Sequence, residues 1–419
     1  MVAPVSLRRP TGPGRRLATL SSSPLAPLAA SSSALRCIRP DSAIHRGLTG
    51  ATTTSQPSSG RSRRSWYGAG RVTLGPVREL SGVVLADYTT LRVGGSASRF
   101  VEVEKPEEAV EVVAAADRTG EPVLILGGGS NVVVPDEGFA GTVVRMTTGG
   151  LHVETTSDLV AVTAQAGEDW DQLVALSVTE RWSGLETMSG IPGLVGATPI
   201  QNVGAYGGEV SETITNVTVY DRRSGATRSM KPAECHFTYR SSVFKGSDRY
   251  VVLDVTYTLE ASSLARPIRY DELSLALGAA VGARLPLTAV REAVLRLRRR
   301  KGMVLDGADP DTASAGSFFT NPIVPLTQVA DLPADLPRWP QSDGTVKISA
   351  AWLIEHAGFG RGYGEGPARI STKHTLALTN RGGARAADLL ALAGEIRDGV
   401  RRQYGIELSH EPVVVGAVL

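Results

Sequence analysis

Two glycine-rich segments carry the strongest chemical signals in the sequence, and the first is Gly127-Gly128-Gly129-Ser130-Asn131. Glycines allow backbone N–H groups to approach an anion such as a phosphate closely, and the Ser130 hydroxyl and the Asn131 amide would add further donors. An ordinary tight turn would have the same composition, because glycine is common in turns. The segment alone therefore leaves an anion-binding turn and a structural turn equally open.

The second glycine-rich segment spans residues 182–208 and contains seven glycines. Apolar residues such as Ile191 and Val195 are interleaved with these glycines, which a solvent-exposed loop would not need. We expect backbone packed closely around a large, flat ligand. The side-chain amides of Gln201 and Asn202 would be available as hydrogen-bond partners for it.

Residues 288–301 end in a dense group of basic side chains. Positive charges at the C-terminus of a helix offset the helix dipole and usually face water. A phosphate-bearing ligand would need the same side chains. From the pattern alone we favour the solvent-facing interpretation for Arg296, Arg298, Arg299, Arg300 and Lys301.

Apolar periodicity predicts the elements that hold these segments. A strand at 99–104 leads into a helix that begins at Pro106, with acids in its first turn, and stops at Gly120. A strand at 123–126 precedes the first glycine turn, and three β-branched residues at 132–134 favour another strand after it. A Rossmann fingerprint needs a glycine turn that opens a helix, so a Rossmann domain is not supported. Further helices are expected at 169–180, 288–301, 352–357 and 389–404, and further strands at 217–220 and 250–259.

Composition restricts the function classes. Hydrophobic residues make up 42% and charged residues 21% of the 419 residues, which is typical of globular proteins and leaves room for two or three domains. Two cysteines, Cys37 and Cys235, cannot supply a disulfide framework, a thiolate zinc site or an iron–sulfur cluster. No stretch is long and apolar enough to span a bilayer, and no G-x-S-x-G elbow of a hydrolase occurs. We expect a soluble protein of a reducing compartment, with no metal site.

Residues 1–72 are predicted to form a disordered Ser/Arg-rich extension, because they contain serine runs, scattered prolines and no sustained apolar period. A transit peptide, a polyanion-binding tail or an upstream mis-assigned start codon would have the same composition. Residues 1–78 hold twelve arginines and one acid, which leaves a net charge of −9 on the remaining chain. Nonspecific nucleic-acid binding through this acidic body is therefore disfavoured.

Six sequence motifs follow one another along the chain. They are LGGGSN at 126–131, SGIPGLVGATPIQNVGAYG at 189–207, FTYRSSVFK at 237–245, AGSFFTNP at 315–322, KISAAWLI at 347–354 and HEP at 410–412. Taken in this order, they resemble one family, the UDP-N-acetylenolpyruvoylglucosamine reductases, also called UDP-N-acetylmuramate dehydrogenases. The resemblance covers about residues 85–419 and leaves only the N-terminal extension outside it.

The resemblance implies an α+β protein with a vanillyl-alcohol-oxidase-like, two-part FAD-binding fold and a third, α+β substrate-binding domain. On this basis we expect FAD-binding subdomains at 73–148 and 149–262, a substrate-binding domain at 263–405, and a C-terminal segment at 406–419 that returns to the active site. None of the six histidines lies in a glycine-rich segment, so FAD is expected to bind non-covalently.

The same resemblance implies an oxidoreductase of peptidoglycan synthesis, and hence of cell-wall growth, cell shape and cell division. NADPH, the co-substrate, would reduce FAD, and hydride would then pass to UDP-N-acetylglucosamine enolpyruvate to give UDP-N-acetylmuramate. We expect a cytoplasmic monomer whose partners are these small molecules, with no nucleic acid and no membrane insertion. The expected FAD-binding residues are Tyr88, Thr89, Arg92, Gly127, Gly128, Gly129, Ser130, Asn131, Ser189, Gly190, Pro192, Gly193, Gly196, Ala197, Gln201, Asn202, Gly204, Ala205 and Tyr206.

By position in the motifs, three residues would be catalytic. Ser317 would donate the proton to the carbanion at C2, while Arg240 and Glu411 would polarise the substrate carboxylate. A guanidinium fork matches a carboxylate, and preorganised charge lowers a barrier where negative charge develops. Tyr239, Tyr270, Lys301 and Asn321 are expected to bind substrate, and for Lys301 this replaces the solvent-facing interpretation.

The sequence departs from the family pattern at Thr320, where lysine is frequent, and at His356, where glutamine is frequent. Substrate binding around these positions is therefore open. Each predicted site residue taken alone could be structural, and a sugar-lactone oxidase of the same fold or a tail-driven binding protein are the rival interpretations. The ordered set of motifs favours the reductase.

Overall fold

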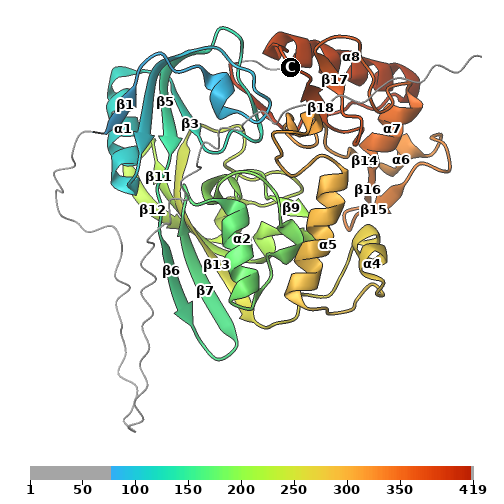
Figure 1. Cartoon of the computed structure of the whole chain (residues 1–419), viewed down its shortest axis with the longest axis horizontal. Coiled ribbons are helices and arrows are strands. Elements are labelled where there is room, and N and C mark those ends of the chain that lie inside the picture. Colours follow the sequence, from blue (N-terminus) through green and yellow to red (C-terminus); the bar gives the residue numbers. More distant parts are fainter. Residues whose placement is uncertain (1–76, 417–419) are drawn as a thin grey trace, which may run out of the picture. The chain divides into compact units, whose positions relative to one another are not determined.

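The first sheet of the computed structural model, which describes residues 77–416, has the strand order β1-β2-β5-β3. Strands β2, β5 and β3 run parallel, while β1 is antiparallel to β2. Helix α1 packs on this sheet, where its Val112 and Val113 share a buried cluster with Val101 and Val144 (Figure 1). The elements of this part are β1 (Arg78–Leu80), β2 (Ala97–Val103), α1 (Pro106–Thr119), β3 (Val123–Leu126), β4 (Val132–Val133) and β5 (Phe139–Met146).

Local sequence fixes both ends of α1. The Glu108 carboxylate accepts hydrogen bonds from the backbone N–H groups of Glu104 and Lys105, which caps the first turn. Pro106 is the first helical residue, where a missing N–H group loses no helical bond. Gly120 ends the helix with a left-handed φ of 70°, so the predicted helix is confirmed.

A second, antiparallel sheet follows in the order β12-β11-β13-β7-β6, with β8 paired to β13. Helix α2 begins where the Asp169 carboxylate accepts from the Gln172 N–H group, and its Trp170 packs in a buried cluster with Tyr257. The predicted helix at 169–180 and both predicted strands are confirmed. The elements are β6 (Leu151–Thr155), β7 (Leu159–Gln165), α2 (Trp170–Thr179), β8 (Trp182–Ser183), β9 (Gly204–Ala205), β10 (Gly208–Glu209), β11 (Ile214–Asp221), β12 (Ala226–Met230), α3 (Pro232–Cys235) and β13 (Tyr250–Ala261).

Two helices come next, α4 (Asp271–Leu277) and α5 (Leu287–Arg300). They share a buried cluster to which α4 contributes Leu273 and α5 contributes Val290, Val294 and Leu297. The helix predicted at 288–301 is confirmed. Its basic end does not face water as a whole, because Arg298 is only 8% exposed. The solvent-facing interpretation is therefore wrong for Arg298, which lies one turn beyond the buried Val294.

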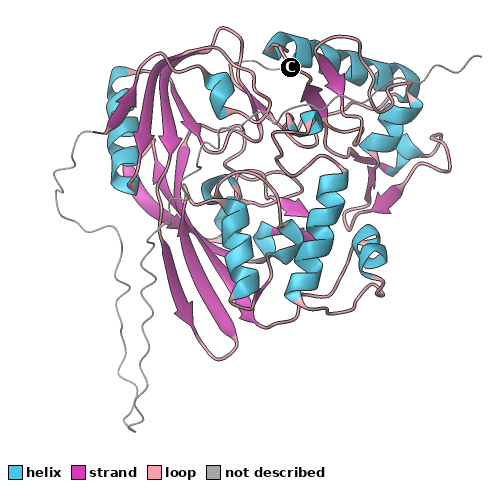
Figure 2. Ribbon diagram, viewed as in Figure 1, coloured by secondary structure: helices cyan, strands magenta, loops and turns pink. Residues whose placement is uncertain are grey.

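The last part of the chain places helices against short strands (Figure 2). Strands β14, β16 and β15 form one small sheet and β17 pairs with β18. Phe318, Ile354 and Leu389 belong to the core cluster that joins these elements, and the helices predicted at 352–357 and 389–404 are confirmed. The elements are β14 (Ile323–Pro325), α6 (Leu326–Val329), β15 (Arg338–Pro340), β16 (Thr345–Ile348), α7 (Ala350–His356), β17 (Ala368–Ile370), β18 (Leu378–Asn380), α8 (Ala386–Tyr404) and β19 (Val413–Val414).

The chain end lies beside the first glycine turn. Strand β19 pairs in parallel with β4, in the register Val413 to Val132, and the Val413 N–H group donates to the carbonyl of Asn131 at 3.0 Å. Residues 410–412 are thereby brought next to residues 127–131, although 280 positions separate Asn131 from Glu411 in the sequence.

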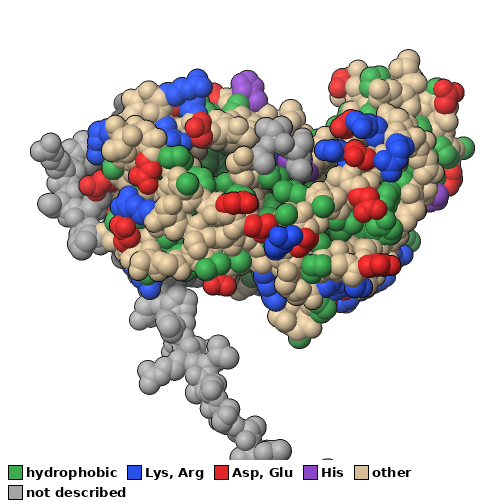
Figure 3. Space-filling model, turned by 90° about the horizontal axis from the view of Figure 1, so that it is seen from above, with side chains coloured by type: hydrophobic (Ala, Val, Ile, Leu, Met, Phe, Trp, Pro, Cys, Tyr) green, Lys and Arg blue, Asp and Glu red, His purple; other side chains and the backbone are tan. Residues whose placement is uncertain are grey.

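The predicted extension at 1–72 lies outside the described residues. Within residues 77–416, no helix combines the length and the apolar character needed to cross a bilayer. On the face seen in Figure 3, basic and acidic side chains are interspersed, with no broad area of one sign. The division into FAD-binding and substrate-binding domains stays a prediction.

Candidate active site

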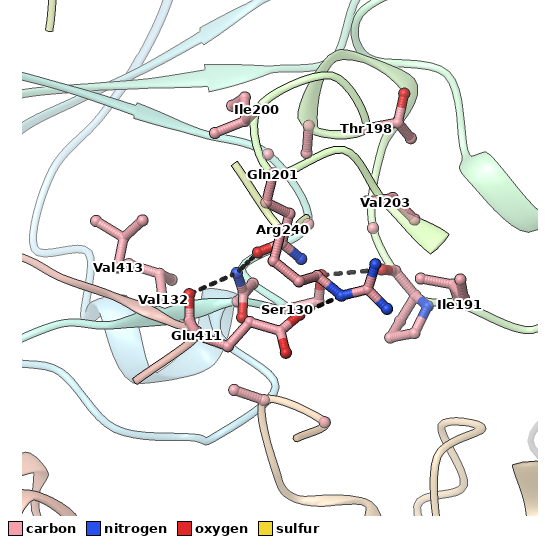
Figure 4. Close-up of a pocket in the computed structure, with 18 of the residues that line it drawn as sticks. Ser130, Val132, Ile191, Thr198, Ile200, Gln201, Val203, Arg240, Glu411 and Val413 are labelled. Carbon is pink, nitrogen blue, oxygen red and sulfur yellow. Dashed lines mark hydrogen bonds and ion pairs between the residues drawn. The ribbon is translucent and has the colours of Figure 1, made fainter. Parts of the chain in front are cut away.

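A pocket of about 1080 Å³ brings together the segments singled out in the sequence (Figure 4). Both glycine-rich segments, the turn that carries Arg240, the C-terminal end of α5 and the loop that carries Ser317 contribute to its wall. Predicted site residues that line it are Gly127, Gly128, Gly129, Ser130, Asn131, Pro192, Gly193, Gly196, Ala197, Gln201, Gly204, Ala205, Tyr206, Tyr239, Arg240, Tyr270, Lys301, Ser317, Asn321 and Glu411.

The turn at 127–131 presents its backbone to this pocket. Its N–H groups donate no hydrogen bond to any acceptor within residues 77–416. A Cβ atom at Gly129, whose φ is 60°, would lie 1.9 Å from the Tyr88 carbonyl oxygen, and one at Gly128 would lie 2.9 Å from the Gly193 Cα. The turn is therefore too closely packed for side chains, while its donors remain available to an anion.

Asn131 links the turn to the rest of the site. Its Nδ2 group donates to the Gln201 side-chain oxygen and, at 3.4 Å, to the backbone carbonyl of Glu411 (Figure 4). The Ser130 hydroxyl donates to the Pro192 carbonyl at 2.9 Å. Both side chains expected to bind ligand are thus used to join the two glycine-rich segments to the chain end.

Arg240 and Glu411 point toward one another in the pocket (Figure 4). The Arg240 Nε atom lies 3.5 Å from a Glu411 carboxylate oxygen, and its Nη2 group donates to the Gly204 carbonyl at 2.6 Å. The Arg240 backbone has a left-handed φ of 54°, and Lys245 donates to its carbonyl oxygen at 3.2 Å. A strained backbone held by such contacts is typical of a functional position.

Glu411 is a mostly buried carboxylate, with its side chain 15% exposed. Burial raises its pKa, and the positive charges of Arg240 and Lys245 oppose that rise. The backbone of Glu411 is fixed because its N–H group donates to the Phe318 carbonyl at 2.8 Å. This bond connects Glu411 directly to the residue that follows Ser317.

Ser317 lies on a loop held by backbone hydrogen bonds. Gly316 has a φ of 70°, and the Phe318 N–H group donates to the Leu376 carbonyl at 2.6 Å. The Ser317 hydroxyl lines the pocket and makes no hydrogen bond to any other residue in 77–416. It is thus free to donate its proton to a ligand.

Tyrosines and a lysine form one corner of the pocket. The rings of Tyr206 and Tyr270 meet edge to face at 5.6 Å between centroids, and the Lys301 Nζ atom lies 5.6 Å from the Tyr206 centroid. Lys301 also donates to a Glu272 carboxylate oxygen at 2.6 Å. Burial raises the pKa of the Tyr206 hydroxyl well above its ordinary value. In this structure the predicted phosphate-binding lysine therefore already holds a carboxylate.

Tyr239 lies between two cations, with the Arg240 guanidinium 5.4 Å and the Lys347 ammonium 4.8 Å from its ring centroid. Asn321 lines the pocket, and its side-chain oxygen accepts from the Ala350 N–H group at 3.0 Å. Its NH₂ group has no partner among residues 77–416.

Six predicted FAD-binding residues do not line the pocket. They are Tyr88, Thr89, Arg92, Ser189, Gly190 and Asn202. Tyr88 packs on Phe100 behind the glycine turn, and the Arg92 side chain borders a separate, smaller pocket. A Cβ atom at Gly190 would lie 2.7 Å from the Leu295 side chain, so this glycine packs against α5.

Asn202 does not line the pocket because its side chain forms hydrogen bonds within the protein. Its Nδ2 group donates to Glu209 at 2.8 Å and to the Thr238 carbonyl at 3.1 Å, and its Oδ1 atom accepts from the Ser211 N–H group at 3.1 Å. Both N–H donors of the buried amide are therefore used within the protein. Ser189 is likewise buried and donates to the Glu186 carbonyl.

The two departures from the family pattern lie outside the pocket wall. Thr320 bonds through both its N–H group and its hydroxyl to the Ser409 carbonyl. The His356 ring stacks on Trp352 with 3.7 Å between centroids. Neither the Thr320 nor the His356 side chain lines the described pocket.

Among the pocket residues that the sequence analysis did not assign to the site are Arg298, Lys347 and His374. Burial lowers the pKa of His374 to about 4, and the positive charges of Lys301 and Arg298 act in the same direction. For Arg298 the sequence did hold a signal, since it follows Val294 by four residues and so extends the apolar face of α5. His374 and Lys347 have no comparable local signal.

Residues 77–416 contain no group of three His, Cys, Asp or Glu side chains placed to hold a metal ion. Cys235 is a buried, free thiol whose pKa burial raises to about 11. It lies outside the pocket wall.

In the comparison with known proteins, two family models match two separate ranges of the chain. A model described as an FAD binding domain matches residues 97–230. A model described as the C-terminal domain of UDP-N-acetylenolpyruvoylglucosamine reductase matches residues 309–415. The first range holds both glycine-rich segments, and the second holds Ser317 and Glu411.

Whole-length relatives agree with this. A UDP-N-acetylenolpyruvoylglucosamine reductase from Thermobifida fusca is 57% identical over 348 residues, covering 80% of this chain and 98% of the relative. Another from Salinispora arenicola is 56% identical over 346 residues, covering 80% and 95%. The crystal structure of UDP-N-acetylenolpyruvylglucosamine reductase from Thermus caldophilus superposes with a TM-score of 0.54 at 27% identity, covering 81% of this chain and 98% of that one, which confirms the predicted fold class. This chain therefore belongs to the UDP-N-acetylenolpyruvoylglucosamine reductase family.

Proposed function

We propose that this chain reduces UDP-N-acetylglucosamine enolpyruvate to UDP-N-acetylmuramate with NADPH and FAD, and that Arg240, Glu411 and Ser317 are its catalytic residues. The family is that of an FAD-dependent oxidoreductase of peptidoglycan synthesis. One observation carries the residue assignment. The ion pair of Arg240 with Glu411 and the free Ser317 hydroxyl share one pocket and are joined by the bond from the Glu411 N–H group to the Phe318 carbonyl.

The residues of the glycine turn fit the diphosphate of FAD. The unpaired N–H groups of residues 127–131 can bind phosphate oxygens, and Gly128 and Gly129 leave no room for a Cβ atom, so the ligand meets bare backbone. The segment at 192–206 lines the adjoining wall. Bound there, FAD would supply the hydride chemistry that links NADPH to the enolpyruvyl group.

Arg240 is positioned to bind the carboxylate of the enolpyruvyl group. Its contacts with Gly204 and Glu411 fix the plane of the guanidinium, so the remaining N–H groups point in a set direction. Negative charge that develops on the substrate carboxylate during reduction is stabilised by this preorganised cation. Glu411 holds the guanidinium in place and shares the same desolvated environment.

Ser317 is positioned to protonate C2. A serine hydroxyl is a weak acid, but it can protonate a very basic carbanion if it is held in line. The loop supplies this alignment through Gly316 and the backbone bonds of Phe318. Tyr239, Tyr270, Lys301 and Asn321, which line the same pocket, are proposed to bind the nucleotide part of the substrate.

The finer features of the protein are proposed on the same basis. The chain would divide into FAD-binding parts at 73–148 and 149–262, a substrate-binding part at 263–405 and the returning segment at 406–419, which is supported by the pairing of β19 with β4. A cytoplasmic monomer fits a reaction whose substrates are a nucleotide sugar and NADPH.

The substitution Ser317→Ala tests the assignment through the two half-reactions. We expect NADPH to bleach the flavin at the wild-type rate, whereas recolouring by the enolpyruvyl sugar slows by about 10²–10⁴-fold, because only the second step needs the proton. Stopped-flow absorbance under anaerobic conditions measures both rates. Ser224→Ala, in an exposed turn, is the matched control. Equal losses in both half-reactions would show that Ser317 is not the proton donor.

A further inference from the structure

Arg298 is a buried cation that the protein itself leaves without an anion. Its side chain lies at the end of α5 and is only 8% exposed. Its Nη2 group donates to the Met303 carbonyl at 2.8 Å, but its buried Nε group has no hydrogen-bond partner. Within residues 77–416 it forms no ion pair. Burial lowers its pKa to about 10.

This arrangement is costly for a folded protein. Removing a charged group from water is strongly unfavourable unless a counter-charge and hydrogen bonds replace the lost hydration. The acid that acts on Arg298 electrostatically is Asp171, and its carboxylate is already bound by Arg291 at 2.6 Å and by the Gly190 N–H group at 2.6 Å. A buried, unpaired polar group next to a pocket is often explained by a ligand.

The position of Arg298 indicates which kind of ligand. It lines the main pocket in the last turn of α5, and Lys301, three residues later, follows the helix and lines the same pocket. The imidazole of His374, whose pKa is held near 4 by burial and by these two cations, is neutral at pH 7. The charge of Lys301 is compensated by its ion pair with Glu272. Arg298 therefore carries the uncompensated positive charge in this part of the pocket.

We propose that Arg298 is a diphosphate-binding residue of this pocket, and that the nucleotide ligand supplies the anion that the protein lacks. A guanidinium presents parallel N–H donors that match phosphate oxygens in a bidentate geometry, and the open Nε group is one of them. This inference rests on the proposed function, in which FAD, the UDP-sugar and NADPH each carry a diphosphate. The glycine turn at 127–131 is proposed to hold the diphosphate of FAD, which leaves the UDP-sugar and NADPH as candidates at Arg298. The shared chemistry is the diphosphate, and the experiment separates the two sources.

The test compares Arg298→Met and Arg298→Lys with the wild-type holoenzyme. Methionine keeps much of the length without charge, whereas lysine keeps the charge without the fork. UDP affinity is measured by titration calorimetry, and the apparent NADPH affinity is taken from the rate of flavin bleaching. Arg299→Met, an exposed neighbour on the same helix, is the matched control and should bind both ligands like wild type.

For Arg298→Met we expect UDP to bind about 10- to 100-fold more weakly, as for the loss of hydrogen bonds to a charged group, with part of the affinity restored in Arg298→Lys. An unchanged NADPH affinity would assign the site to the UDP-sugar, and a loss for NADPH alone would assign it to the dinucleotide. If neither affinity falls, even though the variant melts earlier, Arg298 is only structural and the inference is overturned.

Two further outcomes are decisive. If Arg298→Met does not fold, Arg298→Lys decides, because wild-type affinity for both ligands in that variant would overturn the inference. If the wild-type holoenzyme itself binds neither UDP nor NADPH, the proposed function fails and the inference fails with it. Normal wild-type binding with no effect in the variants leaves the proposed function intact and removes only the role of Arg298.

Discussion

The three proposed catalytic residues could be identified from the sequence, but the distances between them could not. Motif position predicted Arg240, Ser317 and Glu411, and the structure brings all three to one pocket. Their distances could not be predicted, because they depend on the pairing of β19 with β4 and on the bond between Glu411 and Phe318. Arg298 was grouped with its exposed basic neighbours, although its four-residue spacing from Val294 places it on the buried face of α5.

Replacing Arg240 by lysine tests the role of the guanidinium fork. Lysine keeps the charge but cannot bind Gly204 and a substrate carboxylate in one plane, so we expect the rate of enolpyruvyl reduction to fall by about 10²-fold. Flavin bleaching by NADPH should change little. Rapid-mixing absorbance separates the two steps, with the exposed Arg299→Lys as control. An unchanged rate of recolouring by the enolpyruvyl sugar would remove Arg240 from the catalytic set.

At the scale of elements, the helices and long strands form where their sequence patterns predict them. The link between α4 and the pocket could not be predicted from such a pattern. The apolar face and caps of α1 and α5 define them locally. Helix α4 is short, and its Leu275 is 82% exposed. What ties it to the pocket is the bond from Lys301 to Glu272 and the contact of Tyr270 with Tyr206, and neither is visible in a pattern of apolar residues.

The substitution Glu272→Gln is expected to strengthen UDP binding. The Glu272 carboxylate accepts a hydrogen bond from Lys301, so a phosphate bound to Lys301 would compete with it. Because the pair is partly exposed, its contribution is at most about 1 kcal/mol, which limits the gain to roughly fivefold. Titration calorimetry measures it, with the exposed Glu292→Gln on α5 as control. Weaker binding in Glu272→Gln would mean that Glu272 positions Lys301 instead of competing with the ligand.

At the scale of the whole molecule, the active site depends on segments far apart in the chain. The turn at 127–131, the loop around Ser317 and the chain end meet because β19 pairs with β4 and because the Thr90 hydroxyl bonds the Ser314 carbonyl. Sequence motifs predicted which segments belong together, since each has its own signature. They could not predict that the side-chain amides of Asn131 and Asn202 form hydrogen bonds within the protein.

The stability of the ligand-free protein is expected to depend on His374. Its pKa is about 4 in the folded chain and about 6.5 when unfolded, so between these values the unfolded state binds the extra proton and stability falls as the pH drops. From pH 7 to pH 5 this amounts to about 2 kcal/mol. Urea unfolding of wild type and His374→Gln measures it, with exposed His152→Gln as control. The prediction fails if His374→Gln loses as much stability as wild type over this range.

The most direct test of the central claim is an anaerobic titration of the full-length protein followed by its absorbance spectrum. We predict a yellow protein that bleaches on addition of NADPH and recovers its colour when UDP-N-acetylglucosamine enolpyruvate is added, because we propose that one pocket holds the flavin and admits NADPH and the enolpyruvyl sugar in turn. A flavin that NADPH bleaches, but that only oxygen and not the enolpyruvyl sugar recolours, would contradict the account and indicate an oxidase.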